Sequence, residues 1–116
     1  MPHCIIEFSN TLKCQFDIET LMSKVTEGSL ASGLFEAKDV KTRAIGFDYF
    51  QSAGKSEHAD FIHVEVKLLA GRNQLQRKLL SKSVLDAILT LDLNKVSVTI
   101  EINDIDTPSY AKQVLN

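Results

Sequence analysis

The chain has 116 residues, of which 44% are hydrophobic and 24% are charged, with a formal net charge of −2. This composition excludes a disordered chain or a collagen-like fibre, and no apolar run approaches the ~20 residues of a membrane helix. The small negative charge provides no field that would attract nucleic acid. We therefore expect one domain over residues 1–116, with no nucleic-acid partner and no membrane partner.

The N-terminus and the cysteines predict a cytoplasmic protein. The first seven residues lack the basic segment and the long apolar segment of a secretory signal. Cys4 and Cys14 lack the paired spacing of a zinc site, and two cysteines are too few for a disulfide framework. We expect both to be reduced, structural thiols.

The first half of the chain predicts a strand, a helix and a second strand. Apolar and polar residues alternate over 4–8, and apolar residues then recur at helical spacing over about Ile18–Ser32. Asp17 suits the N-cap of this helix, and Gly33 suits the residue that follows its end. A second strand is expected from about Val40 to about Gln51.

The second half repeats this order. A polar turn at Gly54-Lys55 leads to the clearest strand, 61–69, whose alternate residues are apolar. A helix is expected from about Leu75, with its end marked by Asn94, and a strictly alternating strand follows over 96–102. Pro108 precedes a short helical turn in the tail.

This order predicts the topology of the domain. Strand, helix and strand occur twice, and the pattern of 4–8 recurs at 62–66, half a chain later. We predict an α/β (α+β) fold in which two βαβ units share one four-stranded mixed sheet, with both helices on one face. Ile5, Phe61 and Leu69 then point to the uncovered face. Exposed apolar sheet faces mark partner surfaces, so we predict a homo-oligomer.

The sequence contains few recognisable chemical motifs. No nucleotide-binding, HExxH or GxSxG motif is present, and His3, His58 and His63 lack the spacing of metal ligands. We therefore expect no cofactor and no metal.

The unusual chemical feature is Met1-Pro2 directly before a strand. Initiator methionine is commonly removed before proline, and its removal would leave a secondary amine at the end of that strand. Burial and nearby cations disfavour the charged form of an amine and lower its pKa. A neutral amine takes a proton from carbon beside a carbonyl and returns it elsewhere, as a general acid–base catalyst. Alternatively, Pro2 merely begins an edge strand, where its missing N–H does no harm.

Three cations are candidates to stabilise the enolate left by such a proton abstraction. Lys41 and Arg43 are two residues apart in a strand and share one face. Arg72 directly precedes a helix, where the helix dipole and free N–H groups add positive potential. Its planar guanidinium suits a carboxylate, which it holds with two hydrogen bonds. Alternatively, Arg72 is a solvated residue of the turn.

Several short stretches match one known family in order and spacing along nearly the whole chain. They are Met1-Pro2-His3, Ser32-Gly33-Leu34-Phe35, Thr42-Arg43-Ala44, Phe61-Ile62-His63, Ala70-Gly71-Arg72, Ile100-Glu101-Ile102 and Lys112-Gln113. On these stretches the chain resembles the 5-carboxymethyl-2-hydroxymuconate isomerase family of the tautomerase superfamily. The resemblance implies a single tautomerase-like domain of two βαβ units, assembled as a trimer with active sites between subunits.

The resemblance also implies roles for single residues. It implies that Pro2 and Arg72 are catalytic, the latter being the arginine after the Gly-rich turn. A second family arginine falls on Lys41 while the neighbouring Arg43 is kept, so either residue takes the second, substrate-binding cationic role. A family aromatic residue in the second strand falls on Gly46, which would open the pocket.

Together these observations predict a cofactor-free keto–enol tautomerase or delta-isomerase of aromatic catabolism. Its small-molecule substrate would be an unsaturated dicarboxylic or 2-oxo acid, because the reaction is a proton shift and needs no redox partner. One alternative is another reaction of an N-terminal proline, such as dehalogenation or decarboxylation. The other is a non-catalytic oligomeric binding module, which the lysine at position 41 favours.

Overall fold

The computed structural model describes residues 1–53 and 59–116. Four strands and two α-helices alternate with three short 3₁₀ helices in these ranges. The strands are β1 (His3–Ser9), β2 (Lys41–Phe47), β3 (Asp60–Leu69) and β4 (Val96–Ile105), and the α-helices are α1 (Ile18–Ala31) and α2 (Gln74–Ile88). The 3₁₀ helices are η1 (Asn10–Cys14), η2 (Ala37–Asp39) and η3 (Thr107–Ser109). The predicted positions at Gly54, Lys55 and His58 lie outside the described residues.

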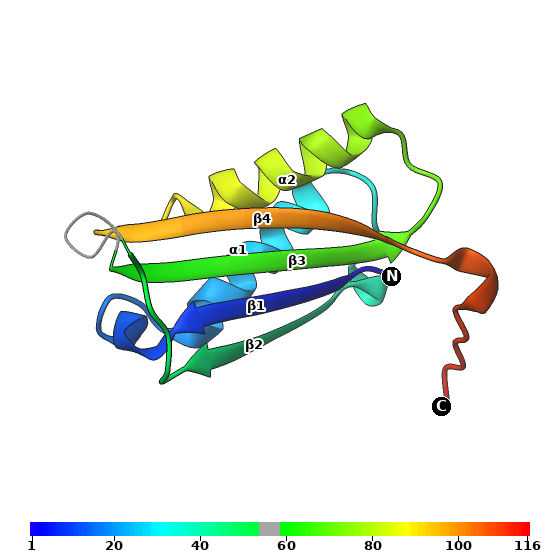
Figure 1. The fold of residues 1–116 in the computed structure, drawn as a ribbon. Helices are drawn as coiled ribbons and strands as arrows, with labels where there is room; N and C mark the ends of the chain where they lie inside the picture. Colours follow the sequence, from blue (N-terminus) through cyan, green and yellow to red (C-terminus); the bar gives the residue numbers. More distant parts are fainter. Residues whose placement is uncertain (54–58) are drawn as a thin grey trace.

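The sheet confirms the predicted arrangement of two βαβ units. Its strand order is β2-β1-β3-β4, in which β1 pairs parallel with β2, β3 pairs parallel with β4, and β1 and β3 meet antiparallel. Both helices lie on one face of this mixed sheet, behind it in Figure 1. The N-terminus and the segment after β4 lie at the same end of the sheet (Figure 1).

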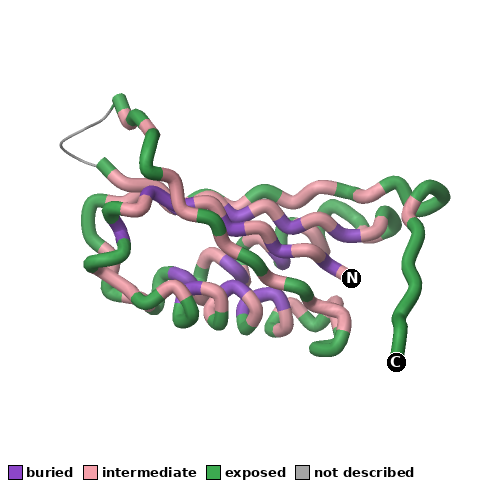
Figure 2. Tube along the Cα trace, turned by 90° about the horizontal axis from the view of Figure 1, so that it is seen from below, coloured by how far each residue is buried: buried purple, intermediate pink, exposed green. Residues whose placement is uncertain are grey.

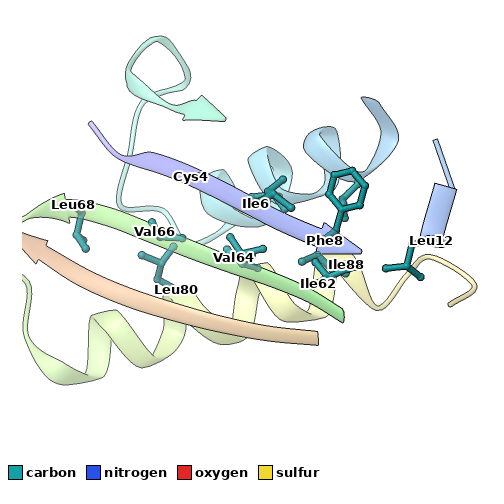
Figure 3. Close-up of a cluster of buried hydrophobic side chains, with 13 residues drawn as sticks. Cys4, Ile6, Phe8, Leu12, Ile62, Val64, Val66, Leu68, Leu80 and Ile88 are labelled. Carbon is teal, nitrogen blue, oxygen red and sulfur yellow. The ribbon is translucent and has the colours of Figure 1, made fainter. Parts of the chain in front are cut away.

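The core lies between the sheet and the two helices. Alternate residues of β1 and β3 point into it, which is why their apolar positions repeat every second residue. Figure 2 shows buried positions on the facing sides of the sheet and helix layers, and Figure 3 shows side chains of the two central strands against α2. Each fully buried aliphatic or aromatic side chain stabilises the fold by about 1.5–3 kcal/mol. The buried set is Cys4, Ile6, Phe8, Leu12, Leu21, Val25, Ile62, Val64, Val66, Leu68, Leu80, Val84 and Ile88.

The helix ends combine expected and unexpected signals. Asp17 is the N-cap of α1 as predicted, although its side chain makes no capping hydrogen bond, and Gly33 follows the helix with φ of +77°. The helix α2 begins with a capping box that was not predicted from the sequence. The Asn73 side chain accepts from the Gln76 N–H at 2.8 Å, and the Gln76 side chain accepts from the Asn73 N–H at 3.0 Å.

Three predicted boundaries are wrong, each for a structural reason. The strand predicted over 96–102 continues to Ile105, because β3 extends to Leu69 and pairs with it there. The strand expected to reach Gln51 ends at Phe47, because its partner β1 ends at Ser9 and the register pairs these two residues. The helix expected to reach Asn94 ends at Ile88, where tight turns take over. The leucines after this end, Leu91 and Leu93, pack against the core from the connection rather than from a helix.

The face of the sheet opposite the helices carries both apolar and charged side chains. Ile5, Phe61 and Leu69 are half-buried there, as predicted, on the strand face opposite the core. Polar pairs lie beside them: His63 Nε2 is 2.8 Å from a Glu101 oxygen on the neighbouring strand. Within the described part of the chain, no helix is long and apolar enough to span a membrane.

Candidate active site

The site is built around the amino end of β1. Pro2 is buried, and its carbonyl oxygen accepts a hydrogen bond from the Lys41 backbone N–H at 3.1 Å. This bond continues the parallel pairing of β1 with β2 and fixes the position of Pro2. The free amino group belongs to Met1 and lies 4.0 Å from a carboxylate oxygen of Asp39, in the η2 turn before β2.

A pocket of about 520 Å³ opens at this end of the sheet. The segment after β4 contributes Tyr110, Lys112, Gln113 and Val114 to the lining of this pocket. Four positively charged or imidazole side chains and one carboxylate give the pocket a cationic character suited to an anionic ligand. It is lined by Met1, His3, Lys38, Asp39, Lys41, Tyr110, Lys112, Gln113 and Val114.

The electrostatics of the pocket disfavour a charged amino group. Burial is the main reason why the pKa of the Met1 amino group lies below its ordinary value. Asp39 opposes this shift because its negative charge stabilises the ammonium form, while Lys112, Lys41 and Arg72 lower the pKa further. An amine at this end of the chain is therefore biased toward the neutral form, which accepts protons.

Lys41 and Arg43 lie on the sheet face that the helices leave open. Lys41 lines the pocket, and its ammonium donates to the Lys38 carbonyl at 3.0 Å. The Arg43 guanidinium lies 3.2 Å from His3 Nδ1, across the β1–β2 pair. Both side chains are exposed, and of the two only Lys41 lines the pocket.

Arg72 lies in the turn between β3 and α2 and is half-buried. Its guanidinium donates to the Leu34 carbonyl at 3.2 Å and stands 5.4 Å from the centre of the Phe35 ring, a cation–π contact. Its charge contributes to the lowered pKa of the Met1 amino group. These contacts hold the guanidinium in place on the segment that leads from α1 to η2.

Several pocket residues, among them Asp39 and Tyr110, were not identified as site residues from the sequence. Tyr110 lies in a tail without apolar periodicity and contacts His3, 107 residues away in the chain, and Lys112 in the same tail pairs with Asp39. The family resemblance marked Lys112-Gln113 as a matching stretch, which is the only signal that pointed toward this tail.

The expectation that Gly46 opens the pocket is wrong. Gly46 pairs with Phe8, at the end of β1 far from Pro2. A Cβ on Gly46 would clash with the side-chain oxygen of Asn10 and would stand 3.0 Å from the Phe8 ring. The missing side chain therefore makes room for Asn10 and leaves the pocket at the other end unchanged.

A second hollow, of about 490 Å³, lies between α2 and β4. Its lining is mainly aliphatic, from Leu75, Leu79, Leu85 and Ile100, with lysines at its rim. Its lining contains no carboxylate, histidine or thiol. The described residues also contain no cluster of His, Cys, Asp and Glu arranged to hold a metal ion.

Comparisons with known proteins agree with this architecture. Residues 2–114 match the family model of 5-carboxymethyl-2-hydroxymuconate isomerase. The chain is 30% identical over 91 residues to the 5-carboxymethyl-2-hydroxymuconate Delta-isomerase of Escherichia coli, covering 78% of this chain and 71% of that protein.

Solved structures share the fold over the full length of the chain. A crystal structure of 5-carboxymethyl-2-hydroxymuconate delta-isomerase superposes with a TM-score of 0.83 at 17% identity, covering 100% of this chain and 89% of that chain. A "W0 fused 4-OT wild type symmetric trimer" superposes with a TM-score of 0.71 at 16% identity, covering 96% and 93% of the two chains. The chain therefore belongs to the 5-carboxymethyl-2-hydroxymuconate isomerase family of the tautomerase superfamily, and it is an isomerase.

Proposed function

We propose that this isomerase is a cofactor-free tautomerase in which Pro2, freed by removal of Met1, moves a proton within an unsaturated 2-hydroxy or 2-oxo dicarboxylic acid. The observation that carries the proposal is the buried Pro2 beneath a pocket in which the pKa of an amino group is lowered. Removal of Met1 transfers the free amino group to the Pro2 nitrogen, one residue further into the buried end of β1. The hydrogen bond from the Lys41 N–H to the Pro2 carbonyl fixes the Pro2 backbone between Met1 and His3, which both line the pocket.

The chemistry needs one basic group that acts twice. The neutral Pro2 amine removes a proton from the dienol, and the electron pair spreads over the conjugated chain to a distal carbon. The protonated amine then returns the same proton to that carbon, so no atom is gained or lost and no electron acceptor is required. A pKa near the working pH lets the amine act first as base and then as acid.

The cations around the pocket supply substrate binding and charge stabilisation. Arg72 carries five N–H donors and its bond to the Leu34 carbonyl uses one of them, so donors remain for a substrate carboxylate. In the proposal Arg72 also stabilises the negative charge that develops on the dienolate. Lys41, on the pocket wall, takes the second cationic role directly, and Arg43 contributes through His3.

We propose that the chain works as a homo-oligomer, with a trimer as the expected state. The half-buried apolar residues on the open sheet face support association, because such faces are costly to leave in water. The superposed symmetric trimer has the same fold. A cytoplasmic location stays a prediction.

The direct experiment compares Pro2→Ala with the wild type on a 2-hydroxymuconate-like dienol, after intact mass has shown that Met1 is absent. We expect kcat/KM to fall about 10²- to 10⁴-fold, the range for loss of a general acid–base catalyst. Lys78→Ala, at an exposed position of α2, is a control that should leave the rate unchanged. Equal rates for Pro2→Ala and wild type would contradict the proposal, and retained Met1 with ligand binding but no turnover would favour the binding module.

A further inference from the structure

A chain of three hydrogen-bonded side chains crosses the pocket from the sheet to the tail. The Arg43 guanidinium lies 3.2 Å from His3 Nδ1, and His3 Nε2 lies 3.2 Å from the Tyr110 hydroxyl. The His3 and Tyr110 rings meet edge to face, with centroids 6.4 Å apart. The Tyr110 hydroxyl in turn donates to the Met1 sulfur at 3.4 Å.

The direction of each bond follows from the donor inventory of the side chains. Arginine has donors and no acceptor, so Nδ1 of His3 must accept from Arg43. A neutral imidazole that accepts at Nδ1 carries its proton on Nε2, and this proton is donated to the Tyr110 oxygen. The Tyr110 proton is then left to point away from His3, toward the place that Met1 occupies.

The surroundings of His3 support this neutral tautomer. Burial lowers the pKa of His3, and the positive charges of Arg43, the amino terminus, Lys41 and Lys67 lower it further. Each of these effects works against an imidazolium, which would donate from both nitrogens and could not accept from Arg43.

The Met1 thioether stands where a ligand would lie once Met1 is removed. Sulfur is a weak acceptor, so an oxygen in this position would take a stronger hydrogen bond from the Tyr110 hydroxyl. The ammonium groups of Lys41 and Lys112 line the same pocket and favour an oxygen that carries negative charge. Such an oxygen develops at carbon 2 when the 2-hydroxyl group of the dienol loses its proton, or when a 2-oxo acid loses a proton from the carbon beside its carbonyl.

We propose that Tyr110 is a further substrate-contacting residue, whose hydroxyl, oriented by His3, donates a hydrogen bond to the 2-oxygen of the substrate. This inference rests on the proposed function, because it places the substrate in the same pocket. Tyr110 sets the preference for 2-oxygenated acids, and His3 is the positioning residue that directs the Tyr110 proton into the pocket.

The test measures binding of two matched ligands, 2-oxoadipate and adipate, by titration calorimetry to the chain that begins at Pro2. We expect wild type to bind 2-oxoadipate about 3- to 10-fold more tightly than adipate, the size of one net hydrogen bond. Tyr110→Phe should remove this preference and leave the adipate affinity unchanged. A preference that persists in Tyr110→Phe would overturn the inference, and so would a wild type that binds the two acids equally or binds neither.

Kinetics separate this inference from the proposed function. Tyr110→Phe should lower kcat on the dienol about 10²-fold and raise KM by no more than about 10-fold, because charge on the 2-oxygen grows in the transition state. His3→Leu should lose the 2-oxoadipate preference, and His3→Gln should restore it, because its amide offers one acceptor and one donor. If Pro2→Ala inactivates the enzyme while Tyr110→Phe leaves kcat unchanged, only the role of Tyr110 fails. If Pro2→Ala is fully active, the proposed function is contradicted, whatever the result for Tyr110→Phe.

Discussion

Lys112 reaches back from the C-terminal tail to Asp39, with its ammonium 3.6 Å from the same carboxylate oxygen that faces the amino terminus at 4.0 Å. One carboxylate therefore joins the tail, the turn before β2 and the N-terminal amine. Asp39 raises the pKa of this amine, whereas burial and the cations lower it, so Asp39 makes the amine more basic than it would otherwise be.

Asp39→Asn should make the amine less basic. Removal of the carboxylate takes away a negative charge that raises the pKa of the amine, and it removes the ion pair with the Lys112 ammonium. The ascending limb of kcat/KM against pH should therefore move to lower pH. Glu36→Gln is a matched control, because Glu36 ion-pairs with Lys38 in the same segment and is exposed. A limb that stays in place or moves to higher pH would show that Asp39 does not act on the catalytic amine.

Arg72→Lys tests whether Arg72 binds a substrate carboxylate through its positive charge alone or also through the geometry of its guanidinium. Lysine keeps the positive charge and loses the planar fork, the bidentate hydrogen bonds and the stacking on Phe35. We expect kcat/KM to fall about 10- to 100-fold on a dicarboxylate and much less on its monoester, measured side by side. Arg77→Lys is the control, since Arg77 pairs with Asp104 on the surface of α2. Equal losses on the two substrates would contradict a carboxylate-binding role.

Gly28→Ala should destabilise the fold although alanine favours helices. Gly28 lies where α1 meets α2, and a Cβ there would stand 2.7 Å from the Val84 Cα and 2.8 Å from the Ser83 carbonyl oxygen. Both are backbone atoms, so the helices must separate, at a net cost of about 1–2 kcal/mol after the gain in helix propensity. Urea denaturation measures this cost. Ser23→Ala, on the exposed side of α1, should stay within ~0.5 kcal/mol of wild type, and equal stabilities for the two variants would refute the close helix contact.

His3 should contribute to a loss of stability in mild acid. Its pKa in the folded chain is lower than the unfolded value of about 6.5. As the pH falls through 6.5, the unfolded chain therefore takes up a proton at His3 that the folded chain resists, and the free energy of unfolding decreases. Urea denaturation of wild type and His3→Gln, measured between about pH 7.5 and 5, tests this. The free energy of unfolding should decrease less in the variant, because it has no imidazole to protonate at position 3. An identical decline in both proteins would mean that His3 titrates freely.

The parts of the fold that were predicted correctly follow from local periodicity. The alternation in Ile62, Val64, Val66 and Leu68 directly reports one buried strand face, and Gly33 marks the end of α1 because its φ is positive. The end of β2 was missed because a strand stops where its partner stops, and the partner Ser9 lies far away in sequence.

Only part of the candidate site could be predicted from the sequence, because it too depends on contacts between distant segments. Residue type, together with a position in or next to a predicted strand or helix, identified three candidates: Pro2, Lys41 and Arg72. Tyr110 and Asp39 join the site through contacts between distant segments, and neither residue has a local pattern that sets it apart. The direction of the Tyr110 hydroxyl depends on a tautomer of His3 that only the position of Arg43 reveals.

The central claim is that the end of β1 lowers the pKa of the Pro2 amine below that of an ordinary α-amino group. Its most direct test is an NMR titration of the chain with ¹⁵N-labelled proline, after intact mass has shown that Met1 is absent. The account predicts that the Pro2 nitrogen titrates below the ~8 of an ordinary α-amino group, because the end of β1 is buried and surrounded by cations. A midpoint at or above that ordinary value would contradict the role of Pro2 as the catalytic base.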